Sequence, residues 1–173
     1  ADLRGRVVAA VHSGWRGALK RITEKTVGEM RRIFGSKPGD LIAALGPSIR
    51  SCCYEVGQEV VDAFCGEFVR GEEFFRKSLS GAGEGIAPAA PTFLSLTPPG
   101  HVLPPRPFFY LDLVAAARDQ LKSAGVPGRH IEVMDFCTSC QNSMFFSYRK
   151  EGAAAGRMMA VIGIRRGSAK QSG

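Results

Sequence analysis

The sequence lacks the features of membrane and secreted proteins. No apolar run approaches the roughly 18 residues that a membrane-spanning helix needs, and residues 1–6 contain no signal-peptide core. Hydrophobic residues make up 45% and charged residues 23% of the 173 positions, which is typical of a globular protein and argues against disorder across the chain. The absence of an initiator methionine indicates a processed, trimmed or partial chain. The composition predicts a globular domain with no membrane partner.

Histidine is scarce, and cysteine is present in an odd number. The chain has three histidines and five cysteines, and the cysteines are Cys52, Cys53, Cys65, Cys137 and Cys140. An odd count that includes an adjacent pair makes a poor disulfide framework, so we expect a reducing, cytoplasmic location. Residues 137–140 form a C-x-x-C, but no second C-x-x-C or H-x-x-H follows it, so it is a weak zinc signal. A thioredoxin-like motif would open a helix, whereas the residues after this one resemble a strand.

The charge is positive and unevenly distributed. The formal net charge is +7, and residues 1–32 carry eight basic side chains against three acidic ones. This balance suits an anionic partner, but no groove-reading or base-stacking motif accompanies it. We therefore expect a basic first helix that attracts a small anion, and no nucleic-acid partner.

Hydrophobic periodicity predicts intermixed strands and helices. The expected strands are 7–11, 41–45, 131–136, 144–148 and 158–164, and the expected helices are 19–33, 57–68 and 113–124. Asp112 is the expected N-cap of the last helix, which Gly125 closes. This order favours an α+β or mixed α/β fold. Residues 78–107 hold seven of the ten prolines and are expected to form a long loop or insert, followed much later by a polar tail at 165–173.

The turn at His12–Gly17 carries the first candidate site. It lies where the strand expected at 7–11 leads into a helix, so its glycines let the backbone approach a ligand and the helix N-terminus presents N–H groups to an anion. His12 is a candidate metal ligand or general base, and Arg16 is suited to hold a phosphate or carboxylate through two parallel hydrogen bonds. The spacing alone is equally typical of a turn with a core histidine and a packing tryptophan.

Two further segments carry candidate chemistry. The first is Gly46–Val56, where a buried strand again delivers a loop and then a helix. The second comprises Cys137 with Thr138, then Phe145–Lys150, then Gly156 with Arg157. Alone, each is more typical of a core than of a site, because aromatic runs and free cysteines are usually buried and inert.

Taken in order, the three motifs resemble those of the YfiH-like family. Its members are peptidoglycan editing factors, also called laccase-domain or polyphenol oxidoreductase proteins and described as purine nucleoside phosphorylases. The family pattern H-A-G-W-R-G is similar to residues 12–17, with Ser13 in place of alanine, and G-P-x-I-x-x-C-C-Y-E-V is similar to 46–56. The pattern C-T…F-F-S-Y-R-R…T-G-R is similar to the third segment, with Lys150 and Ala155 in place of arginine and threonine. The resemblance covers nearly all of the chain outside the insert and the tail.

The resemblance implies an α+β fold of layered mixed β-sheets flanked by helices, here N-terminally truncated. Residues 1–164 would form a single YfiH-like domain, corresponding to the C-terminal part of the family domain. Residues 78–107 would be a Pro/Gly-rich insert in it, and 165–173 a polar tail. Loss of an N-terminal portion is expected to leave an exposed sheet edge or apolar surface.

The resemblance also implies a zinc site formed by two histidines and a cysteine. His12 corresponds to one of the histidines, and the other two ligands lie upstream of it in the family, so they are not present in this chain. We therefore expect well below one zinc per chain. Stoichiometric zinc would instead indicate substitute ligands, and the first to test would be Cys52, Cys53, Cys137 and Cys140.

The implied activity is that of a zinc-dependent purine nucleoside phosphorylase with adenosine deaminase activity, acting on adenosine, inosine or methylthioadenosine together with phosphate. Cleavage of the glycosidic bond requires a positioned phosphate nucleophile and stabilised charge on the base. The candidate catalytic residues are His12, Arg16, Ser147 and Arg149, and the candidate substrate- and phosphate-binding residues are Arg16, Tyr148, Arg149 and Arg157.

Three alternatives stay open. The same type of site suits hydrolysis of an amide in a peptidoglycan precursor, which would remove a wrongly incorporated amino acid. Copper-dependent oxidation of phenols ranks lower, and copper ranks below zinc as a cofactor, because multicopper sites need many histidines. The isolated chain would be inactive if the absent ligands are essential.

Overall fold

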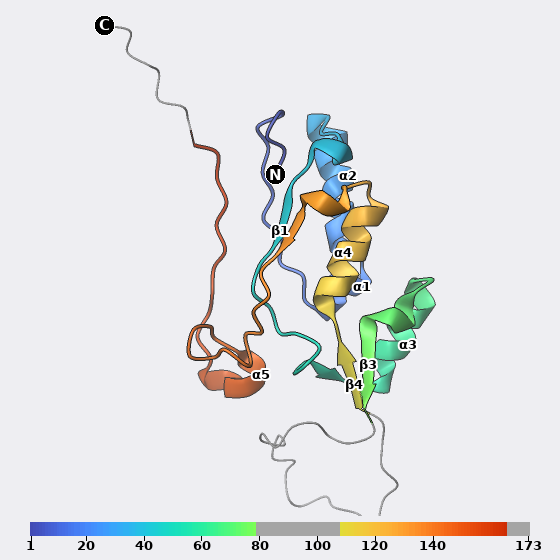
Figure 1. Ribbon diagram of the computed structural model, residues 1–173, viewed down its shortest axis with the longest axis vertical. Helices are drawn as coiled ribbons and strands as arrows, with labels where there is room; N and C mark the ends of the chain where they lie inside the picture. Colours follow the sequence, from blue (N-terminus) through green and yellow to red (C-terminus); the bar gives the residue numbers. More distant parts are fainter. Residues whose placement is uncertain (79–107, 166–173) are drawn as a thin grey trace, which may run out of the picture.

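The computed structural model describes residues 1–78 and 108–165 (Figure 1). The helices there are α1 (Trp15–Leu19), α2 (Ile22–Phe34), α3 (Gln58–Glu67), α4 (Leu113–Ser123) and α5 (Tyr148–Glu151), with short 3-10 turns η1 (Pro38–Asp40), η2 (Gly71–Phe74), η3 (Gly128–His130) and η4 (Gly152–Ala154). The strands are β1 (Ala43–Leu45), β2 (Glu55–Val56), β3 (Phe75–Ser78), β4 (Phe108–Leu111) and β5 (Ile131–Val133). In these ranges no helix is long and apolar enough to cross a membrane.

The strands form two small sheets, one parallel and one antiparallel. β1 pairs with β5 in parallel, with Ala43 opposite Ile131. β4 lies between β2 and β3 and is antiparallel to both. Small parallel and antiparallel sheets packed with helices confirm the α+β class that the sequence indicated.

Helix α4 lies across both hydrophobic cores. Its Ala116 packs with Phe64 and Leu111 in one cluster, while Leu121 packs with Met30 and with other buried residues in the second. Between these two contacts, Gln120 is fully buried, and its Nε2 donates a 2.8 Å hydrogen bond to the carbonyl of Ala18, near the end of α1. In Figure 1, α2 and α4 lie to one side of the β1–β5 pair.

The parallel pairing continues beyond the ends of β1 and β5. Ser48 and Cys137 form an isolated parallel bridge, in which the Thr138 N–H donates to the Ser48 carbonyl at 3.1 Å. β1 and β5 run in the same direction, so the chain leaves both strands at the same end of the sheet. The loops after β1 and after β5 therefore meet at one end of the molecule. This end carries the second and third sequence motifs.

The single helix expected at 19–33 is not continuous. The structure ends α1 at Leu19 and begins α2 at Ile22. Arg21 has a left-handed backbone with φ of 56°. Its guanidinium is held by the carboxylates of Glu24 and Glu67, at 3.0 and 2.6 Å, and lies over the ring of Phe68. Of the apolar face expected from Leu19, Ile22, Thr26, Met30 and Ile33, Met30 is buried as expected, whereas Ile33 is exposed and Val27 is buried in addition.

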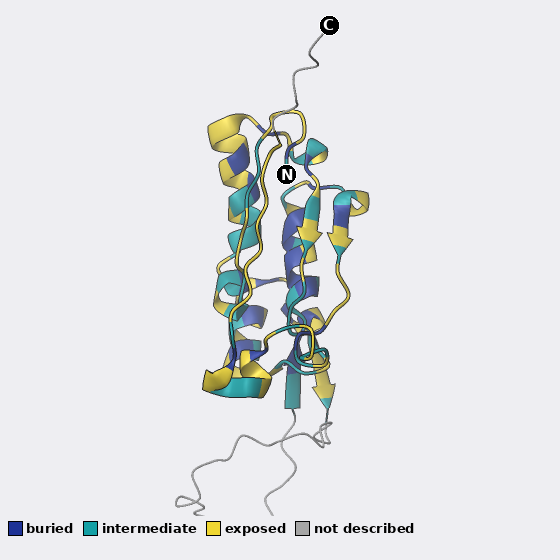
Figure 2. Ribbon diagram, turned by 90° about the vertical axis from the view of Figure 1, so that its left-hand side faces the viewer, coloured by how far each residue is buried: buried dark blue, intermediate teal, exposed yellow. Residues whose placement is uncertain are grey.

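Three expected strands do not form. In 7–11 only Val7 makes a bridge, to Asp2, and no further ladder partner lies in the described ranges. Residues 144–148 form a turn that leads into α5, because the N–H groups of Met144 and Phe145 donate locally to the Gln141 carbonyl. The stretch 158–164 is unpaired within the described chain and exposes several apolar side chains (Figure 2).

The short strands β2, β3 and β4 were not predicted, whereas several local expectations are confirmed. Asp112 caps α4, with its Oδ1 accepting a 2.9 Å hydrogen bond from the Ala115 N–H. Gly125 follows the helix with φ of 92°, as expected for a closing glycine. The expected insert lies outside the described residues except for Ser78, and so does the expected tail except for Arg165.

Glycine at position 71 is required by close packing. A Cβ there would collide with the Phe64 carbonyl oxygen and would lie 2.7 Å from Cα of Cys65, both of which are backbone atoms that cannot move aside. We expect Gly71→Ala to lower the free energy of unfolding by about 1–3 kcal/mol, measured by urea unfolding with circular dichroism.

The matched control for this prediction is Gly66→Ala in α3, where nothing lies within 4 Å of the added atom. This change should raise the free energy of unfolding by about 0.5–1 kcal/mol, because alanine favours helix more than glycine does. Equal effects of the two substitutions would contradict the packing at Gly71.

Candidate functional site

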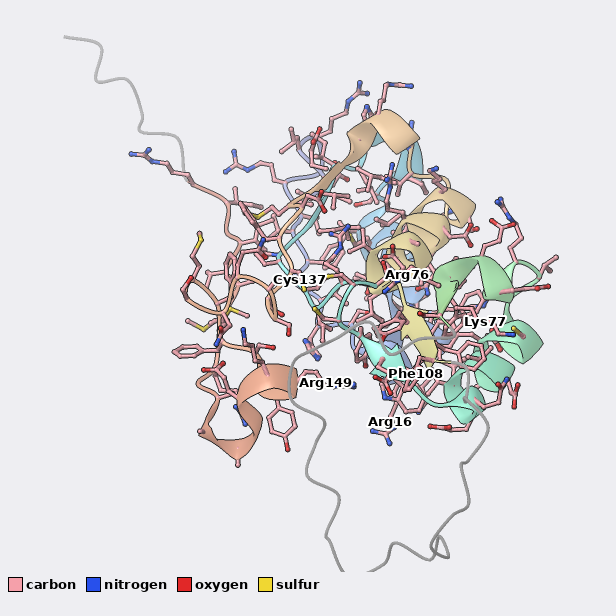
Figure 3. All side chains as sticks on the ribbon, turned by 60° about the horizontal axis from the view of Figure 1, so that its bottom comes forward. Arg16, Arg76, Lys77, Phe108, Cys137 and Arg149 are labelled. Atoms are coloured by element: carbon pink, nitrogen blue, oxygen red, sulfur yellow. The ribbon has the colours of Figure 1, made fainter. Side chains whose placement is uncertain are left out.

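Two arginines from separate helices act on Tyr54, which lies just before β2. The guanidinium of Arg149, in α5, lies over the Tyr54 ring at 5.0 Å from its centroid, and Arg149 Nη1 donates a 2.7 Å hydrogen bond to the Glu55 carbonyl. Arg16, in α1, is close enough for its charge to act on the Tyr54 hydroxyl, and its guanidinium lies over the ring of Trp15. We call Arg16, Tyr54 and Arg149 the arginine–tyrosine cluster; Figure 3 labels its two arginines.

A third arginine approaches the same loop from the antiparallel sheet. Arg76, in β3, donates from Nη2 and Nε to the Ser51 carbonyl, at 3.2 and 3.4 Å. The loop that leads to β2 is therefore bound by Arg76 near one end and by Arg149 near the other. Planar guanidinium groups gathered in this way are suited to hold a phosphate through parallel hydrogen bonds.

The Tyr54 hydroxyl is neutral at physiological pH. Burial raises its pKa, while the positive charges of Arg149 and Arg16 act in the opposite direction without cancelling the effect of burial. A neutral phenol can donate a hydrogen bond to an anionic or carbonyl oxygen. The arginine–tyrosine cluster thus combines fixed positive charge with a hydrogen-bond donor.

Four cysteines meet beside this cluster. They are Cys52 and Cys53 in the loop after β1, and Cys137 and Cys140 in the loop after β5. We call them the four-cysteine cluster. Their sulfur atoms all lie within 4.8 Å of one another, and Cys140 Sγ lies 3.6 Å from Cys52 Sγ and 3.4 Å from Cys53 Sγ. A group of this kind could hold a metal ion.

The buried Cys137 sulfur is surrounded by hydrogen-bond donors. Burial acts to raise its pKa, but the backbone N–H groups of Cys140, Arg50 and Ser139 and the thiol of Cys52 donate to it and lower the pKa to about 7. Burial and the neighbouring thiols raise the pKa of Cys52. Cys137 is therefore a favoured thiolate of the cluster.

His12 is not part of the four-cysteine cluster. It is exposed in the segment before α1, and no group of three metal-binding side chains in the described ranges includes it. The zinc site that the resemblance implied, with a second histidine and a cysteine, is therefore not completed around His12 by these residues. We assign no chemical step to a metal at His12.

The predicted residues at the start of α5 lie next to Arg149. Ser147 is buried, and its backbone N–H donates a 2.6 Å hydrogen bond to the Glu151 carboxylate, which fixes the first turn of this short helix. Tyr148 is exposed. Both side chains stay candidates for orienting a substrate.

Arg157, the last predicted phosphate ligand, turns back on its own segment. Its Nη1 donates to the carbonyls of Ala155 and Gly156, at 2.8 and 3.1 Å. The described contacts therefore place Arg149 on Tyr54, the charge of Arg16 acts on the same tyrosine, and Arg157 is held to its own backbone.

Two parts of this site were missed from the sequence. Tyr54 was included in a motif but not selected, although an aromatic residue directly after the cysteine pair was a usable signal. The C-x-x-C at 137–140 lacks a second pair of ligands in the sequence around it, so the four cysteines were only substitute ligands to test, whereas the structure brings Cys52 and Cys53 to it as two further sulfurs. Recognition that β1 and β5 are parallel neighbours would have revealed the cluster.

Comparisons with known proteins agree with this architecture. The family model described as multi-copper polyphenol oxidoreductase laccase matches residues 1–165. Purine nucleoside phosphorylase YlmD of Geobacillus stearothermophilus is 36% identical over 159 residues, covering 92% of this chain and 49% of that protein. Adenosine deaminase RL5, from an unknown prokaryotic organism, is 34% identical over 162 residues, covering 93% of this chain and 52% of that protein.

A solved structure gives the same result. The chain is similar to the hypothetical protein YfiH of Bacillus licheniformis with a TM-score of 0.61 and 31% identity, covering 82% of this chain and 43% of that one. The fold and the ordered motifs thus define a laccase-like domain of the YfiH type. The chain belongs to this multi-copper polyphenol oxidoreductase laccase family, and it spans about half the length of the relatives that it matches.

The geometry around Tyr54 predicts a titration effect. Replacement of Arg149 by glutamine removes a positive charge that favours the phenolate, so the pKa of Tyr54 should rise further above its ordinary value. Ultraviolet titration of tyrosinate measures this pKa, and a Tyr54→Phe variant assigns the signal among the three tyrosines.

The control for this titration is Arg129→Gln. Arg129 lies in η3, just before β5 begins, and therefore at the opposite end of the parallel strand pair from the loop that carries Tyr54. The Arg129→Gln substitution should therefore leave the pKa of Tyr54 unchanged. A similar shift in both variants would contradict the specific contact between Arg149 and Tyr54.

Proposed function

We propose that the protein is a purine nucleoside phosphorylase that also deaminates adenosine, with phosphate bound at the arginine–tyrosine cluster. The observation that carries this proposal is the Arg149 guanidinium over the Tyr54 ring, with Arg16 near enough for its positive charge to act on the Tyr54 hydroxyl. The names of two relatives, a purine nucleoside phosphorylase and an adenosine deaminase, support the same class of substrate. The substrates would be adenosine, inosine or methylthioadenosine.

In phosphorolysis, a phosphate oxygen attacks the anomeric carbon of the ribose, and the purine leaves with the electrons of the glycosidic bond. Arg16 and Arg149 would hold the phosphate by charge-assisted hydrogen bonds and so fix its direction of approach. The neutral Tyr54 hydroxyl would donate to a phosphate oxygen or to the nucleoside. Ser147 and Tyr148, next to Arg149, would orient the sugar or base.

His12 keeps the role that the resemblance implied, as a candidate zinc ligand in the whole protein. This part of the proposal depends on ligands outside the described residues. The five cysteines are all unpaired, which favours a reducing cytoplasm as the place of action.

The whole protein, with every zinc ligand that the resemblance implies, tests the proposal by release of free purine base from each of the three nucleosides, with and without phosphate, and by formation of inosine from adenosine. We expect base release only when phosphate is present. Arg149→Gln should raise KM for phosphate about 10-fold or more, because a hydrogen bond to a charged group contributes about 1.5–3 kcal/mol.

Arg129→Gln is the matched control and should leave KM for phosphate unchanged. Parallel assays with a peptidoglycan precursor and with a phenol separate the remaining alternatives. Release of an amino acid from the precursor, or oxidation of the phenol, without any phosphorolysis would replace the proposed function.

A further inference from the structure

We propose that the four-cysteine cluster binds one zinc ion, which fastens the loop after β1 to the loop after β5. Four thiolates around a zinc ion, each at about 2.3 Å, would place neighbouring sulfurs about 3.8 Å apart. The sulfur of Cys140 lies 3.6 and 3.4 Å from those of Cys52 and Cys53, and all four sulfurs lie within 4.8 Å of one another. The cluster thus already has the spacing of ligands around one shared centre.

The chemistry of the donors selects the metal. Four sulfur ligands in a tetrahedron suit zinc or iron, whereas calcium and magnesium need oxygen ligands. An iron–sulfur cluster would hold its cysteine sulfurs further apart, because several ions and bridging sulfides lie between them. The short sulfur–sulfur distances therefore favour a single metal ion. Of the two metals, zinc has no redox chemistry, so it can bind without an electron donor or acceptor.

The surroundings supply what a zinc site of this type needs. Zinc with four thiolates carries a net charge of −2. Arg50 lies two residues before Cys52 and brings a positive charge to this turn, and its Nη2 also pairs with Asp135 at 3.1 Å. The backbone N–H groups of Arg50, Ser139 and Cys140 donate to the sulfur of Cys137, as outer-shell partners of a metal ligand do. Binding would release the thiol protons to solvent.

The site is open to metal from one side and anchored on the other. Cys52 and Cys140 are exposed, so zinc has access from solvent, while Cys137 is buried beside the Ser48 bridge. All four coordination positions would be filled by protein, which leaves none for water or substrate. The zinc would therefore be structural.

A structural zinc here would also position the proposed site. Tyr54 directly follows Cys53, and the N–H groups of both residues donate to the Arg50 carbonyl, at 2.8 and 2.9 Å respectively. A metal that fixes Cys53 would thus fix the turn on which Tyr54 meets Arg149. The inference does not depend on the proposed activity, because metal binding can be measured without substrate.

The first experiment measures metal on the chain purified under reducing conditions. After removal of metal by a chelator, the chain is given Zn²⁺ or Co²⁺ and dialysed, and metal is counted by elemental mass spectrometry. We expect one ion per chain, in place of the low occupancy expected from His12 alone. The cobalt form should show the intense thiolate-to-metal absorption of a tetrahedral sulfur site, and zinc should protect four of the five thiols from alkylation.

Substitutions then assign the ligands. Cys140→Ser should lower zinc affinity by more than the roughly 10–100-fold that the loss of an outer-shell partner costs, and Cys52→Ser serves as a second variant if the first does not fold. Cys65→Ser is the matched control, because Cys65 is an exposed cysteine of α3 outside the cluster, and it should keep full occupancy.

Three results would overturn the proposal. The first is a reduced chain that retains no zinc. The second is zinc that survives Cys140→Ser and Cys52→Ser but is lost in His12→Ala, which would place the metal at His12. The third is preferential retention of iron, or a disulfide from Cys140 to Cys52 or Cys53 that persists in the reducing buffer.

Discussion

The parallel pairing of β1 with β5 is the constraint on which the candidate site depends. Because the pairing continues through Ser48 and Cys137, two loops far apart in the sequence leave the sheet at the same end. One loop brings Cys52, Cys53 and Tyr54, and the other brings Cys137 and Cys140. A change of register between the two strands would separate the sulfurs and move Tyr54 away from Arg149.

Helix α4 holds this strand pair in relation to the antiparallel sheet. It packs on one hydrophobic core through Ala116 and on the other through Leu121, and the buried amide of Gln120 bonds to α1 between them. Since α1 carries Arg16, the position of one arginine of the site is set by the same buried helix. Packing of α4 in the two apolar cores therefore also fixes the position of α1, and with it Arg16.

The sequence predicted those features that depend on neighbouring residues. The Asp112 cap, the closing Gly125 and the fold class were confirmed because each follows from local chemistry or from the order of elements. The division of the helix at Arg21 depends on Glu67, which is 46 residues away, so periodicity could not indicate it. Arg16 and Arg149 were selected for their charge and their place in the motifs, whereas the role of Tyr54 and the meeting of the four sulfurs depend on contacts between distant residues, which only the tertiary structure shows.

The separation along the chain has a consequence for how the protein forms. Cys52 and Cys140 are 88 residues apart, and β1 and β5 are separated by a similar length of chain. Contacts of such high sequence separation slow folding, because the entropy of loop closure is lost before the contact stabilises anything. During synthesis on the ribosome, β1 emerges long before β5. It has no parallel partner strand until α3, α4 and then β5 have been made. We therefore expect the end of the molecule that carries the candidate site to form late in folding.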